Sequence, residues 1–280
     1  MVFILYLGKA LFNYIMDNQL IAKLQLDLLK ESLEKAGEII LNYFGESLQI
    51  ENKTSVSDVR TKADIEVEKY IIACLVNIFP YFNISGEGTG FIDNKSEYTL
   101  HIDPIEGTSN FVLGIPVFVI NVGLMHKQDI IAGFIYNPIT KDYYGALKGQ
   151  GAYLNDKQIF VNGINSIEKS VIDYNFSYST PNQLRNWITE NLRDKKIKRA
   201  LDLWCGGYSF CLLASGKIEA VLVEGDELYD FIAGKLIAKE AGALITDFNG
   251  EAETNMSNSR FIASNGQIVH LELVSILTGK

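Results

Sequence analysis

Apolar residues recur at intervals of three and four over residues 18–43, and this spacing predicts an amphipathic helix. The apolar positions are Leu20, Ile21, Leu24, Leu28, Leu29, Leu33, Ala36, Ile39 and Ile40. A second amphipathic helix is predicted over residues 65–79, where Pro80 stops it, and Asp64 stands at its start in the position of an N-cap. The polar stretch of residues 53–64 is expected to form a loop between the two helices.

Strands are predicted where β-branched and aromatic residues gather between turns. A short strand from Ile84 leads into a glycine-rich turn that contains Glu87. The next strand, residues 99–103, is expected to end at Asp103 because Pro104 cannot donate to a sheet. Three further runs predict consecutive antiparallel strands, and these are residues 116–125, 129–136 and 142–147.

A break at residues 155–170 is the expected boundary between two halves of one compact unit. The halves are residues 18–155 and 156–280, and residues 1–17 form an N-terminal extension. Strands are predicted at residues 171–176, 220–223, 244–247 and 260–264, and helices at 182–192, 208–215, 230–242 and 268–277. Asp230 takes the N-cap position of its helix, and Gly242 closes that helix.

Composition narrows the class of protein. The chain has 280 residues, 48% hydrophobic and 21% charged, which is typical of a globular protein. A net charge of −9 argues against direct nucleic-acid binding and against an anionic membrane surface. The cysteines Cys74, Cys205 and Cys211 form no C-x-x-C pair, so we expect a reduced, cytoplasmic compartment. The apolar start at residues 1–7 is too short to span a bilayer.

Candidate chemistry gathers in the stretch Asp103-Pro-Ile-Glu-Gly-Thr108. Asp103 and Glu106 lie close together with no Lys or Arg beside them, and such carboxylates repel one another unless a cation such as Mg²⁺ or Ca²⁺ lies between them. Gly107 and Thr108 offer backbone N–H groups and a hydroxyl to a phosphate oxygen. The stretch therefore predicts a metal and phosphate site, whereas His101, on the same strand face as Asp103, is interpreted as a core histidine.

Four separated motifs carry a family resemblance. They are Lys53…Asp58-Val-x-Thr-x-x-Asp64, Gly86-Glu87, Asp103-Pro-Ile-Glu-Gly-Thr-x-Asn-Phe111, and Tyr-Asp230-x-x-Ala-Gly…Glu-Ala-Gly242. In this order they closely resemble the inositol monophosphatase family of Mg²⁺-dependent, lithium-sensitive sugar-phosphate phosphatases. The resemblance runs from the first amphipathic helix to the C-terminus. It implies an α/β fold of alternating αβαβα layers, with two sheets between helices, and a homodimer.

The resemblance also implies a set of metal ligands. Glu87, Asp103 and the backbone carbonyl of Ile105 would hold one Mg²⁺ ion, and Asp103, Glu106 and Asp230 would hold a second. A third, loosely held ion is an alternative.

The resemblance also implies which residues bind phosphate and which take part in catalysis. Gly107 and Thr108 would bind phosphate. Thr108, Asp64 and Glu87 would be the catalytic residues, with Thr108 and Asp64 orienting and deprotonating the attacking water. The product would be inorganic phosphate and an alcohol.

Three positions depart from the family pattern. Glu106 stands where Asp is usual, Tyr229 stands where Trp is usual, and Gly-Thr-Gly follows Glu87 where a second acid is common. Substrate choice is expected to depend on the segment before Asp230, in which Glu224 is the candidate contact for sugar hydroxyls.

Inositol monophosphate is the expected substrate. Histidinol phosphate, fructose 1,6-bisphosphate and 3′-phosphoadenosine 5′-phosphate are the alternatives within the enzyme class. A weakly active relative that works through protein or RNA partners is the alternative outside it, and Glu106 is the residue that keeps that alternative open.

Overall fold

The computed structural model describes residues 19–46, 50–52, 59–194, 197–253 and 256–278. The expected extension of residues 1–17 and the motif residues Lys53 and Asp58 lie outside the described part. Within that part, no helix is both long enough and apolar enough to cross a membrane.

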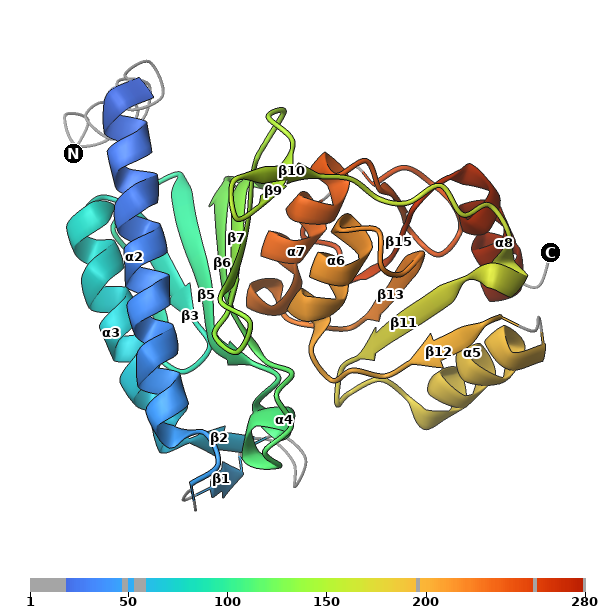
Figure 1. Ribbon diagram of the computed structural model, residues 1–280, viewed down its shortest axis with the longest axis horizontal. Coiled ribbons are helices and arrows are strands. Elements are labelled where there is room, and N and C mark those ends of the chain that lie inside the picture. The colour runs from blue at the N-terminus through green and yellow to red at the C-terminus, as the bar shows by residue number, and fades with distance from the viewer. Residues whose placement is uncertain (1–18, 47–49, 53–58, 195–196, 254–255, 279–280) are drawn as a thin grey trace.

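Helices and sheets alternate in five layers (Figure 1). Helices α2 (Gln19–Tyr43) and α3 (Lys62–Ile78) cover the outer face of a large sheet. Helices α6 (Gly206–Ala214) and α7 (Leu228–Glu240) lie between this sheet and a smaller one. On the far side of the smaller sheet lie α5 (Asn182–Asp194) and α8 (Gln267–Thr278). This arrangement confirms the predicted αβαβα fold.

The large sheet has eight strands in the order β10-β9-β8-β7-β6-β5-β3-β4. Strands β3 and β5 run parallel, and the other neighbours run antiparallel. The strands are β3 (Asn83–Gly86), β4 (Gly90–Ile92), β5 (Tyr98–Glu106), β6 (Val119–His126), β7 (Asp129–Asn137), β8 (Asp142–Leu147), β9 (Ala152–Leu154) and β10 (Lys157–Ile159). The predicted consecutive antiparallel strands are therefore confirmed as β6, β7 and β8.

The smaller sheet has five strands in the order β12-β11-β13-β15-β14. Strand β11 runs parallel to both of its neighbours, and β15 runs antiparallel to both of its own. The strands are β11 (Val171–Phe176), β12 (Arg199–Leu201), β13 (Ala220–Glu224), β14 (Leu244–Thr246) and β15 (Arg260–Ser264). Short elements complete the fold: β1 (Ile50–Asn52), β2 (Val59–Thr61), α4 (Thr108–Val112) and η1 (Ile167–Lys169).

The apolar stripe of α2 is only partly buried. Leu29, Leu33 and Ile40 are buried against the large sheet, but Leu24 is 58% exposed and Leu28 is 40% exposed. Leu24 and Leu28 are four residues apart and share a face of α2 that lies beside the buried face of Leu29 and Leu33.

Strand β5 continues through Pro104 to Glu106, so the prediction that it ends at Asp103 was wrong. The pairing of β5 with β6 shifts register between Asp103 and Glu106. A register shift tolerates proline because the missing N–H falls where the ladder is already interrupted. The Asp103 carboxylate accepts a hydrogen bond from the Ile105 amide at 3.0 Å, which gives that amide a partner inside the irregularity.

The predicted N-cap positions of Asp64 and Asp230 were also wrong. Helix α3 begins at Lys62 with Thr61 as its cap, and α7 begins at Leu228 with Glu227 as its cap. Both aspartates occupy the third helical position and accept a hydrogen bond from the backbone N–H of the capping residue. Each aspartate is therefore the reciprocal acceptor of a capping box.

Candidate active site

Three elements bring the predicted carboxylates to one region. Asp103 lies on β5, Glu87 lies in the turn between β3 and β4, and Asp230 lies in the first turn of α7. Asn121 of β6 links two of them, because it pairs with Asp103 across the sheet and its side-chain amide donates to the Asp230 carbonyl at 2.9 Å. Close packing supports this link, since a Cβ on Gly123 of β6 would stand 2.4 Å from Ile232 of α7 and would have no room.

The carboxyl groups of Asp103 and Asp230 lie near enough to each other for Asp230 to raise the pKa of Asp103. Burial raises the pKa of Asp103 well above its ordinary value, and the neighbouring charges of Glu87, Asp230 and Glu106 raise it further. Asp230 keeps some exposed surface, yet burial of its carboxyl group, followed by the charge of Asp226, raises its pKa well above the ordinary value as well. Such a crowd of carboxyl groups is stable either when protons are shared or when a cation lies between them. The donor set therefore fits a hard divalent cation.

The described residues include no group of three or more His, Cys, Asp or Glu side chains placed so that it could hold a metal ion. The metal-ligand assignments of Glu87, Asp103, Ile105 and Asp230 stay predictions.

Glu68 supports the turn that carries Glu87. Its Oε1 atom accepts from the amides of Gly88 and Thr89, both at 2.9 Å, and its Oε2 atom lies 3.3 Å from Nη2 of Arg60. The Glu68 side chain is buried, and a Cβ on Gly86 would overlap its Oε1 atom. Glu68 was not among the predicted site residues. Its spacing is nevertheless a signal, because it follows Asp64 by four residues and so lies on the same face of α3.

Asp64 and Thr108 meet at the end of β5. The Oδ2 atom of Asp64 accepts from the backbone amide of Thr61 at 2.7 Å and from its hydroxyl at 2.6 Å. The Oδ1 atom lies 3.3 Å from the Thr108 hydroxyl, which also lies 2.9 Å from the carbonyl oxygen of Ile105. One carboxylate oxygen is therefore fixed by the capping box and the other faces Thr108.

The Gly107–Thr108 turn is held in place by its own backbone conformation. Gly107 has a φ of 94°, which favours glycine, and a Cβ there would stand 2.9 Å from the carbonyl oxygen of Val117. Asn110 of the following helix α4 donates to the carbonyls of Val117 at 2.9 Å and Leu203 at 2.7 Å. The predicted phosphate turn is thus tied to the segment before β6 and to the segment before α6.

Glu106 points to the beginning of α6. Its carboxylate accepts from the amide of Gly206 at 2.7 Å, from the amide of Gly207 at 3.0 Å and from the thiol of Cys205 at 2.9 Å. Burial raises the pKa of Glu106 to about 7, although these three hydrogen bonds act in the opposite direction. No observation tests its predicted role as a metal ligand.

Glu224, the predicted substrate contact, lies at the end of β13. One of its carboxylate oxygens lies 2.9 Å from Nε of Arg260 on the neighbouring strand β15. Burial raises the pKa of Glu224, and the positive charge of Arg260 acts against that rise. Its contact with sugar hydroxyls stays a prediction.

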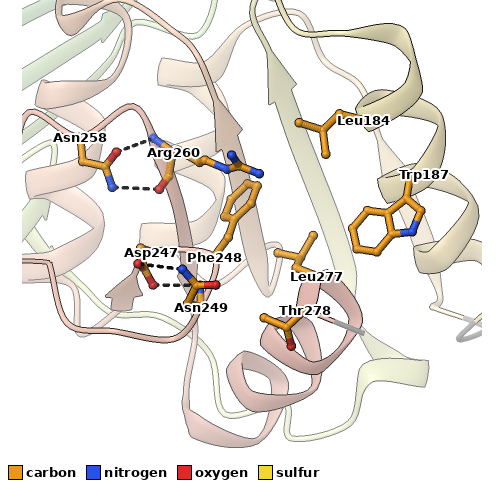
Figure 2. Close-up of a pocket in the computed structure, with 9 residues that line it drawn as sticks. All are labelled: Leu184, Trp187, Asp247, Phe248, Asn249, Asn258, Arg260, Leu277 and Thr278. Carbon is orange, nitrogen blue, oxygen red and sulfur yellow. Dashed lines mark hydrogen bonds between the residues drawn. The ribbon is translucent and has the colours of Figure 1, made fainter. Parts of the chain in front are cut away.

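A cavity of about 590 Å³ opens away from these carboxylates. Figure 2 shows Leu184 and Trp187 on one side of it and Phe248 with Arg260 on the other. None of the predicted site residues lines this cavity. Arg260 is the link between the two regions, since it also contacts Glu224.

His101 is buried, as the sequence analysis expected, but its Nδ1 atom has no hydrogen-bond partner among the described residues. Burial lowers its pKa to about 4, so the ring is neutral near pH 7. The prediction of a core histidine is thus confirmed by the burial of His101.

Comparison with known proteins decides the family. The family model for the inositol monophosphatase family matches residues 25–278. The chain belongs to this family. Inositol monophosphatases form a class of phosphomonoesterases, so the predicted enzyme class is confirmed.

Relatives within the inositol monophosphatase family carry several names. An inositol monophosphatase of Dictyostelium discoideum is 30% identical over 88% of this chain and 90% of its own length. A fructose-1,6-bisphosphatase/inositol-1-monophosphatase of Thermotoga maritima is 29% identical over 90% of this chain and 95% of its own. A protein of Haemophilus influenzae named Nus factor SuhB is 28% identical over 87% of this chain and 92% of its own length.

Solved structures agree with the fold. An inositol monophosphatase of Thermotoga maritima superposes with a TM-score of 0.82 and 29% identity, over 91% of this chain and 96% of that one. The extragenic suppressor protein SuhB of Bartonella henselae superposes with a TM-score of 0.84 and 26% identity, over 90% of this chain and 97% of that one.

Proposed function

We propose that this family member is a Mg²⁺-dependent phosphomonoesterase that hydrolyses a small phosphate ester, with inositol monophosphate as the first candidate. The observation that carries the proposal is the pair of contacts at one end of β5. There, the carboxyl groups of Asp103 and Asp230 lie close together, and Asp64 lies within reach of the Thr108 hydroxyl. The first contact is suited to a cation and the second to a proton transfer.

Glu87, Asp103 and the carbonyl of Ile105 would hold one Mg²⁺ ion, and Asp103, Asp230 and the remaining predicted ligand, Glu106, would hold a second. Bound Mg²⁺ would lower the pKa of water and offset negative charge on the phosphate. Asp103 is only 3% exposed. Solvent therefore screens the attraction between its carboxylate and a bound cation only weakly.

Thr108 and Asp64 would orient the nucleophilic water. Thr61 immobilises the Oδ2 atom of Asp64, which leaves Oδ1 directed at the Thr108 hydroxyl. If the Thr108 hydroxyl donates to Oδ1, its oxygen can accept a hydrogen bond from water and align that water for attack. The proton released on attack would then pass by way of Thr108 to Asp64 Oδ1. Gly107 and Thr108 would bind phosphate through their backbone N–H groups.

A phosphate-release panel with and without Mg²⁺ tests this proposal. The panel contains inositol monophosphate, fructose 1,6-bisphosphate, histidinol phosphate and 3′-phosphoadenosine 5′-phosphate. Fructose 1,6-bisphosphate is the second candidate because curated relatives carry that activity in their names. We expect Asp103→Asn to lower turnover by about a hundredfold or more without loss of folding. Absence of turnover on every ester by folded, metal-binding protein would refute the proposal.

A regulatory role is the second candidate function, and similarity to proteins named Nus factor SuhB favours it. The net charge of −9 favours a protein partner over direct RNA contact. A pull-down in which an Asp103→Asn variant retains a specific partner, with no phosphatase activity in the wild type, would support this role over catalysis.

We further propose a cytoplasmic homodimer. The cysteines Cys74, Cys205 and Cys211 are free thiols, which suits a reducing compartment. The dimer rests on the family resemblance, and sedimentation equilibrium would test it by giving the mass of one or two chains.

A further inference from the structure

Glu106 has one more methylene group than aspartate, and the structure shows where that length is used. Its Oε1 atom accepts from the Gly206 amide, and its Oε2 atom accepts from both the Gly207 amide and the Cys205 thiol. A carboxylate has about four lone-pair directions, so three of them are taken by these donors. Gly206 and Gly207 open α6, so the carboxylate also lies at the positive end of a helix dipole.

The start of α6 is built for this close approach. A Cβ on Gly207 would stand 2.5 Å from Oδ1 of Asn121, and a Cβ on Gly206 would stand 3.1 Å from Nδ2 of Asn175. Two side-chain-free residues therefore let the helix backbone come within hydrogen-bonding distance of Glu106. Cys205 also packs against the phosphate turn, because a Cβ on Gly107 would stand 3.3 Å from its Sγ atom.

We infer that Glu106 is a positioning residue that ties the phosphate turn to α6, and that it does not bind a metal ion. The cation site of this chain then consists of Glu87, Asp103, Asp230 and the Ile105 carbonyl. This inference rests on the proposed function for the identity of the metal site. Its structural part, the tether, does not depend on turnover.

The test uses Mn²⁺ as the metal probe and three variants of the full chain. Bound Mn²⁺ is counted by electron paramagnetic resonance, and thermal unfolding is recorded without metal. For Glu106→Gln we expect wild-type Mn²⁺ stoichiometry and affinity, together with a melting temperature lower by about 2–6 °C, because an amide NH₂ would face a backbone donor. Asp230→Asn is the matched control, for which we expect Mn²⁺ affinity to fall at least tenfold (about 1.4 kcal/mol) without loss of thermal stability.

Two results would overturn the inference. One is a tenfold or greater loss of Mn²⁺ affinity, or the loss of a bound ion, in Glu106→Gln. The other is an unchanged melting temperature in that variant. If Glu106→Gln does not fold, the same measurements are made on Cys205→Ala. This variant removes the thiol donor to Glu106 and keeps the Glu106 carboxylate. A lower melting temperature with normal Mn²⁺ binding supports the tether, and an unchanged melting temperature refutes it.

Kinetics at saturating Mn²⁺ separate positioning from general stabilisation. Loosening the Gly107–Thr108 turn should raise the KM of Glu106→Gln several-fold, more than it lowers kcat. An unchanged KM would refute the positioning role. If the wild type hydrolyses none of the panel esters, the proposed function fails, but the melting and Mn²⁺ measurements still decide the role of Glu106.

Discussion

Glu68 offers the sharpest test of how the fold prepares the site. Its carboxylate accepts from the amides of Gly88 and Thr89, both at 2.9 Å, and lies 3.3 Å from Arg60. The turn that it holds carries Glu87, a predicted metal ligand. Removing Glu68 should therefore lower stability and weaken metal binding together, although Glu68 itself is outside the predicted ligand set.

The expected magnitude follows from these contacts. A hydrogen bond to a charged group contributes about 1.5–3 kcal/mol. We take the low end for each amide because Gly88 and Thr89 are exposed and water can replace the acceptor. Glu68→Ala should thus lower the free energy of unfolding by about 3 kcal/mol. Glu68→Gln keeps an acceptor oxygen and loses the charge opposite Arg60, so about 1 kcal/mol is expected.

Urea unfolding of the metal-free protein measures the stability change, and the Mg²⁺ concentration for half-maximal phosphate release measures the change in metal binding. Glu66→Gln is the matched control, because Glu66 is exposed and lies two residues earlier on the same helix, where it accepts from the Tyr43 hydroxyl. The control should leave the Mg²⁺ requirement unchanged. A Glu68→Ala variant that loses stability but keeps the wild-type Mg²⁺ requirement would show that the turn does not depend on Glu68 to position Glu87.

Three further predictions test other parts of the molecule. Asp64→Asn and Thr108→Val should each lower turnover by about a hundredfold. The double variant should lose little more, because the two residues act together in one proton transfer. Additive losses of activity in the double variant would show that they act independently. Burial lowers the pKa of His270 from 6.5 to about 4. The unfolded chain then binds a proton that the folded chain excludes, so stability should fall as pH drops from 6.5 towards 4, and His270→Gln should flatten that part of a pH series of urea midpoints. Lys235 is buried 2.6 Å from Glu253, so Glu253→Gln should cost about 3–5 kcal/mol in urea unfolding, and replacing Lys235 by Met as well should recover part of that loss.

Local patterns predicted the elements well and their ends poorly. The run of β-branched and aromatic residues between turns identified β11 at residues 171–176 as the structure has it. The end of β5 was missed because proline was expected to stop the strand, whereas the register shift against β6 accommodates it. That shift depends on a partner strand, and a single run of residues contains no information about its partner.

The direction of a side chain is harder to predict than its presence in a motif. Glu106 was placed with the metal ligands because of its position in the motif that carries the family resemblance, three residues after Asp103. Its hydrogen-bond donors, Gly206 and Gly207, are 100 and 101 residues away and come into reach through the packing of α6 against the sheet. Glu68 could have been found, since its spacing from Asp64 places both on one helix face, but its role becomes clear only when the turn after β3 is seen.

Counting carboxylate oxygens distinguishes a cap from a ligand at this site. For Asp64 and Asp230, the structural and the functional interpretations are compatible, because a capping box occupies one oxygen of each. The second Asp64 oxygen faces Thr108, and the Asp230 carboxyl also lies close to that of Asp103. Glu106 differs because both of its oxygens accept from α6. A helix terminus that takes one oxygen orients the other towards the site, whereas a terminus that takes both withdraws the residue from it. We therefore infer that the longer Glu106 side chain binds the start of α6 and no metal ion. The number of Mn²⁺ ions bound by Glu106→Gln tests this directly.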